Sequence, residues 1–182
     1  MRRLLTMRWS RGVYCAARGG TNPMGAKGET LAKQFESKAQ EATAVFEKLS
    51  DADWKKITQA EKWPVGVTAH HVAQSHMGIA GLIKSVASGQ HKASISMDDI
   101  HAGNAQHAKE FASVGKADTV ALHKKNAAEA AAIVRGLDDA ALARSASALK
   151  GMPPMTTEQA VVGILIGHID EHIGSIRKTV SA

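Results

Sequence analysis

The chain has 182 residues, of which 44% are hydrophobic and only 4% aromatic, and its formal net charge is +6. A chain of this length can form one domain with a sizeable core, and its alanine-rich, aromatic-poor composition favours helices over strands, so we expect an all-α fold. The single cysteine, Cys15, excludes an intrachain disulfide and a thiolate-rich metal site and fits a reducing compartment.

Residues 1–27 form a basic leader without acidic residues, and without them the chain has 17 basic and 17 acidic residues. Because the body is neutral, we expect no nucleic-acid partner. Residues 1–23 have the composition of an organelle-targeting segment. They are explained as well by a start codon assigned too early, with the true start at Met24 or Met7. We favour the second interpretation, which predicts a cytoplasmic protein with its domain at residues 28–182.

Apolar side chains recur at helical spacing in four long segments. Pro64 suits the first turn of the second segment, and Asp118 and Gly136 suit the start and end of the third. We expect the four helices at about residues 29–49, 64–88, 118–135 and 156–180. Such segments with moderate connections predict a four-helix bundle. No membrane span is expected, because the longest apolar run, 160–167, is shorter than the ~20 residues required.

The connections between these segments are polar. In the first, 51–62, we expect Trp54 to anchor the packing, as we do for Trp63 just beyond it. The second, 90–115, is predicted to contain a short helix near 98–112. The third, 138–155, is predicted to be a loop with about one helical turn.

The histidines can be sorted by helix face, because each helical residue turns by about 100°. His168 and His172 lie four residues apart at the inner edge of their apolar stripe, so their imidazoles can reach one point. His71 faces the core from the second helix. Its neighbour His70 is predicted to face outward or along a flank, and His76 lies at the far edge of the stripe.

Three inward imidazoles need partners, because burial removes their hydrogen bonds with water. A hydrogen-bonded core cluster would satisfy them, and so would one divalent metal ion. Three neutral imidazoles are a known ligand set of catalytic zinc, and imidazole also suits nickel, iron and copper. The residues alone leave both interpretations open. The remaining connector histidines, His91, His101 and His107, are expected to be solvated.

Two motifs resemble those of the DinB-like family. Residues 63–72, WPVGVTAHHV, are similar to the motif of its second helix, in which a Trp precedes the metal-binding His by eight positions and so selects His71. Residues 168–174, HIDEHIG, are similar to its final helix, and residues 99–105 are similar to a middle connection in some members. Ser175 departs from the family pattern, since many members have Gln there.

The resemblance covers about residues 28–180 and implies the four-helix bundle of DinB/YfiT-like metalloenzymes, which is often dimeric. It implies that His71, His168 and His172 hold one divalent ion, with zinc or nickel favoured over iron. Relatives include mycothiol-dependent maleylpyruvate isomerase and bacillithiol S-transferases, while many members have no assigned activity. We therefore expect a small-molecule substrate, a homodimer, and a low-molecular-weight thiol as cosubstrate, with glutathione as the first guess.

Two functions compete at this stage: a metal-dependent thiol S-transferase or isomerase, and a non-enzymatic metal-binding or stress-response bundle. A closed structural site needs a fourth protein ligand, for which His123 is the least unsuitable candidate. No general base is evident, because Asp170 and Glu171 fall on the outer face, and Asn104 is at most a substrate contact. A di-iron carboxylate site is excluded by the lack of Glu-x-x-His pairs.

Overall fold

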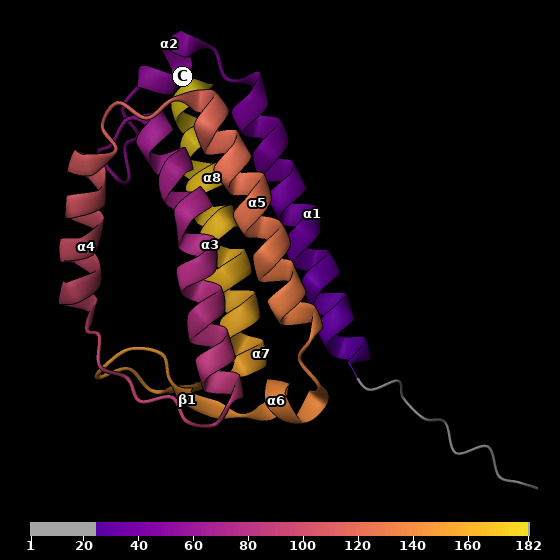
Figure 1. The fold of residues 1–182 in the computed structure, drawn as a ribbon. Helices are drawn as coiled ribbons and strands as arrows, with labels where there is room; N and C mark the ends of the chain where they lie inside the picture. Colours follow the sequence, from indigo (N-terminus) through magenta and orange to yellow (C-terminus); the bar gives the residue numbers. More distant parts are fainter. Residues whose placement is uncertain (1–24, 182) are drawn as a thin grey trace, which may run out of the picture.

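The computed structural model describes residues 25–181, so Cys15 and residues 1–24, most of the leader, lie outside the described part. Four long helices pack side by side, and the fourth is built from three consecutive segments (Figure 1). They are α1 (Ala26–Lys48), α3 (Val65–Ala87), α5 (Lys116–Arg135), and the run of α7 (Thr157–Ala160), η1 (Val161–Ile166) and α8 (Gly167–Val180). The all-α prediction is confirmed. Within the described residues no helix is long and apolar enough to cross a membrane.

The helices are not arranged in simple up-and-down order. In Figure 1, α1 and the α7–η1–α8 helix run one way, and α3 and α5 run the other way. Helix α5 packs between α1 and α3, and α8 contacts both α1 and α3 on the other side. Because α3 and α5 are parallel, the chain must return between them, and α4 (Met97–Glu110) makes this return along the outside of the bundle.

The core is made mostly of aliphatic side chains, many of them alanine, from all four long helices. Alanine has a small side chain, which lets neighbouring helices approach closely, and larger residues fill the remaining space. Among the largest side chains that are fully buried are Phe35, Phe46, Ile83, Leu165 and Ile176. The backbones approach closely at Gly28, where a methyl group would collide with carbonyl oxygens at and just after the end of α5.

The short connections contain more structure than the sequence indicated. Ser50 and Ser96 each form a capping box that starts a helix, at α2 (Asp51–Lys55) and at α4. The third connection folds into α6 (Asp139–Ala143) and a two-stranded antiparallel ribbon of β1 (Ser145–Ser147) and β2 (Pro154–Thr156). This ribbon was not predicted, because three-residue polar strands leave no alternating apolar pattern to detect.

Two details of the long helices differ from prediction. Helix α5 begins at Lys116 after Gly115, so Asp118 lies in the first turn and is not the cap. In the fourth helix, η1 is a π-helix, which turns through a smaller angle per residue than an α-helix. Val162, an apolar residue of this segment, is 47% exposed.

Candidate metal centre

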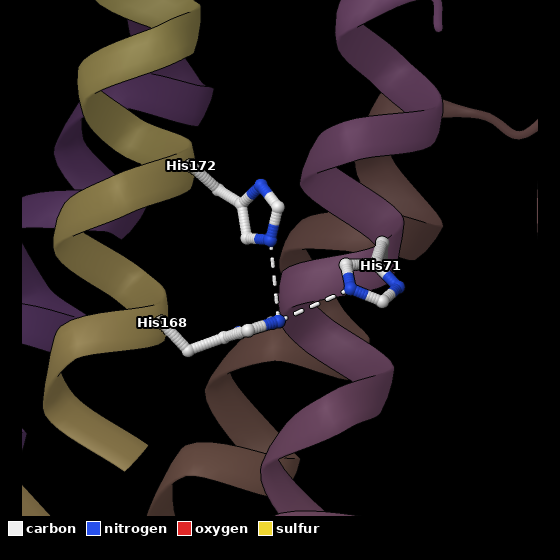
Figure 2. Close-up of side chains that lie close together, drawn as sticks. All are labelled: His71, His168 and His172. Atoms are coloured by element: carbon white, nitrogen blue, oxygen red, sulfur yellow. Dashed lines mark hydrogen bonds between the residues drawn. The ribbon is translucent and has the colours of Figure 1, made fainter. Parts of the chain in front are cut away.

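Three histidines from two antiparallel helices converge on one point in the bundle (Figure 2). His71 projects from the early turns of α3, and His168 and His172 project from successive turns of α8. The Nε2 atom of His168 lies 3.1 Å from Nε2 of His71 and 3.2 Å from Nε2 of His172. The structure thus brings together the three residues that the sequence placed on inward faces.

The spacing of these nitrogens fits a shared metal ion. A ring nitrogen of a neutral imidazole carries either a proton or a lone pair, so one Nε2 atom cannot pair well with two further Nε2 atoms. Tetrahedral zinc with nitrogen ligands at about 2.0–2.1 Å places those nitrogens roughly 3.3 Å apart. Within residues 25–181, His71, His168 and His172 form the group that could hold an ion, with all ligand atoms within 4.8 Å of one another.

Burial keeps two of these histidines neutral. Burial, followed by the neighbouring imidazoles His172 and His107, lowers the pKa of His71 to about 4. Burial, together with His172 and His71, lowers the pKa of His168 to about 2. Neutral imidazole is the form that binds metal, so both rings are ready to act as ligands near neutral pH.

Sequence analysis missed Glu61, which lies in the connection before α3 and contacts α8. Its Oε1 accepts a hydrogen bond from Nδ1 of His172 at 2.8 Å, and its Oε2 accepts one from the Ser175 hydroxyl at 2.6 Å. Burial raises the pKa of Glu61, but the hydrogen bonds from Ser175 and His172 outweigh burial and hold it below its ordinary value. An ionised carboxylate behind a ligand histidine is the usual support of a metal site. Ser175, in the position where many relatives have Gln, is part of that support.

A cluster of aromatic rings covers the other side of His71. The ring centroids of Trp63 and His71 lie 5.5 Å apart, and those of His107, on α4, and His71 lie 5.3 Å apart, both in an edge-on arrangement. His70 stacks on Phe111 at 4.0 Å, and its Nδ1 lies 3.4 Å from Nε2 of His107. His70 therefore lies along a flank of α3, one of the two predicted positions, but it is buried there. The prediction that His107 is solvated was wrong, because α4 and the residue after it fold back over that flank of α3.

The remaining histidines lie outside the triad. His123 is fully buried, but its two ring nitrogens contact His76 and a backbone carbonyl of α1, so it is not a fourth ligand. His91 is half-buried against Ser85, contrary to expectation, while His101 is exposed as predicted.

The polar residues considered for other roles do not belong to the histidine triad. Asp170 and Glu171 are exposed as predicted, and Asp170 pairs with Lys38 at 3.0 Å. Asn104 is half-buried on α4. A groove of about 790 Å³ runs between the connection after α2 and α8, and it reaches Ser175 without being lined by the triad.

Comparison with known proteins gives one family and one fold. The family model described as the DinB superfamily matches residues 34–176. A solved structure of a mutant of mycothiol-dependent maleylpyruvate isomerase is similar with a TM-score of 0.62 and 12% identity, over 82% of this chain and 59% of that chain. At this identity the likeness shows the fold alone, and the chain spans 59% of that protein's length. No curated protein matches.

Proposed function

The chain belongs to the DinB superfamily, and on this premise we propose that it is a metal-dependent enzyme. His71, His168 and His172 bind one divalent ion, zinc or nickel, and the substrate is a small molecule with a low-molecular-weight thiol as cosubstrate. The observation that carries the proposal is the convergence of three Nε2 atoms at 3.1 and 3.2 Å, a spacing that suits ligands of one ion and does not suit a hydrogen-bonded trio.

The residues around the triad prepare it for this role. Glu61 accepts from Nδ1 of His172, which leaves the Nε2 lone pair of that ring free to bind the ion. Ser175 holds the second oxygen of Glu61 and so fixes the direction of the carboxylate. A bound ion would supply Lewis acidity, which lowers the pKa of a coordinated thiol or water.

The ligand set supports an open position at the ion. A closed structural zinc site has four protein ligands, whereas catalytic sites keep three and leave one position for water or substrate. Among residues 25–181, no fourth His, Cys, Asp or Glu joins the triad. The nearby ring of His107 is engaged with His70 and with the backbone at Val67. An open position therefore supports the enzyme over a structural site.

The thiol is suggested by the fold neighbour, whose title describes a mycothiol-dependent isomerase. In a transfer reaction, the thiolate sulfur would bond to an electrophilic carbon of the substrate while the leaving group departs, and the thiol proton would pass to solvent. In an isomerase, the thiol would add reversibly and be released. Glutathione is the first thiol to test.

The alternative is a bundle that binds metal without turnover. It is favoured by the depth of the site, since His71 is 8% exposed and the side chain of His172 is 12% exposed. It is also favoured by the groove of about 790 Å³, which passes the site without being lined by a histidine of the triad. Substrate would have to reach the ion through a movement of the surrounding elements.

The first experiment is elemental analysis of protein purified without an affinity tag. We expect about one zinc or nickel ion per chain in the wild type, and loss of that ion in the double variant His168→Ala, His172→Ala. The exposed His101→Ala variant is the matched control and should keep the ion. If wild-type protein contains no metal and cannot be reloaded, the histidines are a core cluster and the proposal is wrong.

The second experiment separates the enzyme from the metal-binding bundle. Metal-loaded protein is incubated with glutathione, mycothiol or bacillithiol and a panel of small electrophiles and isomerisable substrates. Both the loss of free thiol, which reports transfer, and the thiol-dependent conversion of the substrate, which reports isomerisation, are followed. Turnover that disappears in the double variant and persists in His101→Ala supports the enzyme. Full metal loading without turnover of any thiol supports the alternative.

A further inference from the structure

We propose that His76 and His123 are positioning residues of the metal centre, which act on His168 through its buried Nδ1 atom. His76 accepts a hydrogen bond that originates at Nδ1–H of His168 and passes through one bridging water, and this fixes the ring with Nε2 as the metal ligand. The proposal rests on the metal site described above. It adds two residues that are not members of the triad.

The direction of the hydrogen bond between His76 and His123 follows from the bond that His123 makes to Ala39 on α1. Nε2 of His123 lies 3.0 Å from the carbonyl oxygen of Ala39, and a carbonyl can only accept, so Nε2 of His123 carries the proton. Burial lowers the pKa of His123, so its ring is neutral and its Nδ1 is an acceptor. Nε2 of His76, 3.1 Å from that atom, must therefore donate to it. This leaves Nδ1 of His76 with a lone pair.

Two buried ring nitrogens are then complementary. Within residues 25–181, Nδ1 of His76 and Nδ1 of His168 are buried and have no hydrogen-bond partner. When Nε2 of His168 binds an ion, its Nδ1 carries the proton. One atom is thus an acceptor and the other a donor. An unpaired buried polar group of this kind costs about 1–3 kcal/mol, so two such groups that can reach one another are expected to pair.

The two rings lie in the same part of the interior. His71 touches His168 directly, and His76 lies five residues further along α3, a rise of about 7.5 Å. Because α8 runs antiparallel beside α3, this step leads toward the beginning of α8, where His168 lies (Figure 1). A single water can bridge two buried polar groups that do not touch.

The resulting chain crosses the whole bundle. It runs from Ala39 of α1 through His123 of α5 and His76 of α3 to His168 of α8. The rings of His76 and His123 also make edge-on aromatic contacts. The ring centroids of Phe35 and His76 lie 5.3 Å apart. A similar contact joins Phe46 to His123 at 5.2 Å. All four long helices therefore contribute to the orientation of one metal ligand.

The first test uses zinc-loaded wild-type protein and two-bond ¹H–¹⁵N spectra of the imidazole rings. We expect the Nε2–H tautomer for His76 and His123, and Nδ1–H with a metal-bound Nε2 for His168. A proton on Nδ1 of His76 would remove the acceptor and overturn the proposal. The measurement needs no variant, so it decides the question even where substitutions in the core prevent folding.

The second test compares His76→Phe, which keeps a ring without an acceptor, with His76→Asn, which can return an acceptor near the position of Nδ1. We expect His76→Phe to weaken zinc binding about 10–100-fold in competition with a chelator, and His76→Asn to recover part of it. The exposed control His101→Phe should bind zinc as the wild type does. Affinities are measured below the unfolding temperature of each metal-free variant.

The outcomes distinguish the two proposals. If the wild type takes up zinc and His76→Phe binds it equally well despite lower thermal stability, the pair has a packing role only and the inference is wrong. If the wild type takes up no metal ion, the metal site itself is wrong and the inference falls with it.

Discussion

At the scale of single residues, the candidate centre depends on which nitrogen of each imidazole carries the proton. His172 has its proton placed on Nδ1 by Glu61, whose side chain is 9% exposed and ionised. A charged acceptor makes a stronger hydrogen bond than a neutral one. The carboxylate therefore both orients the ring and raises the electron density on Nε2, as partners behind metal ligands commonly do.

This role of Glu61 predicts the effect of its neutral isostere. Glu61→Gln keeps the shape of the side chain but replaces the charged acceptor of the bond from His172 with a weaker, neutral one. We expect zinc affinity to fall about 10–100-fold, measured by competition with a chelator, while the helical content stays unchanged. Glu171→Gln, at an exposed position on α8 that lines the groove, is the control. Equal affinity in both variants would show that Glu61 does not support the site.

At the scale of elements, close packing between helices sets where the site residues stand. The π-helix η1 comes directly before the segment that carries His168 and His172, so it sets the rotation of these residues relative to the start of the fourth helix. The N-terminal part of α1 packs against the end of α5 at Gly28. A side chain there would have to displace backbone atoms, which cannot move as a flexible side chain can.

The contact at Gly28 predicts opposite effects for two glycine substitutions in helix interiors. In Gly28→Ala, the new methyl group would meet the carbonyl oxygens of Leu137 and Val134, so we expect a loss of about 1–3 kcal/mol. In Gly78→Ala, the methyl group meets nothing within 4 Å, so the better helix propensity should stabilise the protein by up to about 1 kcal/mol. Urea unfolding measures both. A stabilised Gly28→Ala variant would contradict the close approach of α1 and α5.

At the scale of the whole molecule, buried histidines couple stability to pH. Burial, with the charge of His123, lowers the pKa of His76 to about 3, and His71 is lowered to about 4. In the unfolded chain both histidines have the ordinary histidine pKa of about 6.5. Between these values the unfolded chain binds more protons than the folded one, so the stability present above pH 6.5 is lost as pH falls toward the folded pKa values.

For metal-free protein we therefore expect the free energy of unfolding to decrease as pH falls from 7 to 5. Each of these histidines contributes a slope of up to about 1.4 kcal/mol per pH unit in this window. Urea unfolding at half-unit pH steps measures the slope. The His76→Phe variant should show a smaller slope, because one titrating group is gone. A stability independent of pH between 7 and 5 would mean that these rings are not buried as neutral groups.

The sequence by itself determined the helical class, the approximate extent of the four long helices and the inward faces of His71, His168 and His172. These features depend on composition and on local periodicity, which repeat every few residues and can be read without knowing the neighbouring helices. The resemblance of the Trp63 motif to the family's second helix selected the same residue, His71, from an adjacent pair. Local signals such as these are present in the chain before it folds.

Only the tertiary structure decided what each inward side chain meets. Glu61 reaches His172 from 111 positions away, and His76 meets His123 from 47 positions away, so no local pattern could reveal either pair. The covering of His70 depends on the path of α4, a helix that buries none of its own residues. Contacts between distant segments depend on helix register and on the route of the connections, and both are settled only when the whole bundle packs.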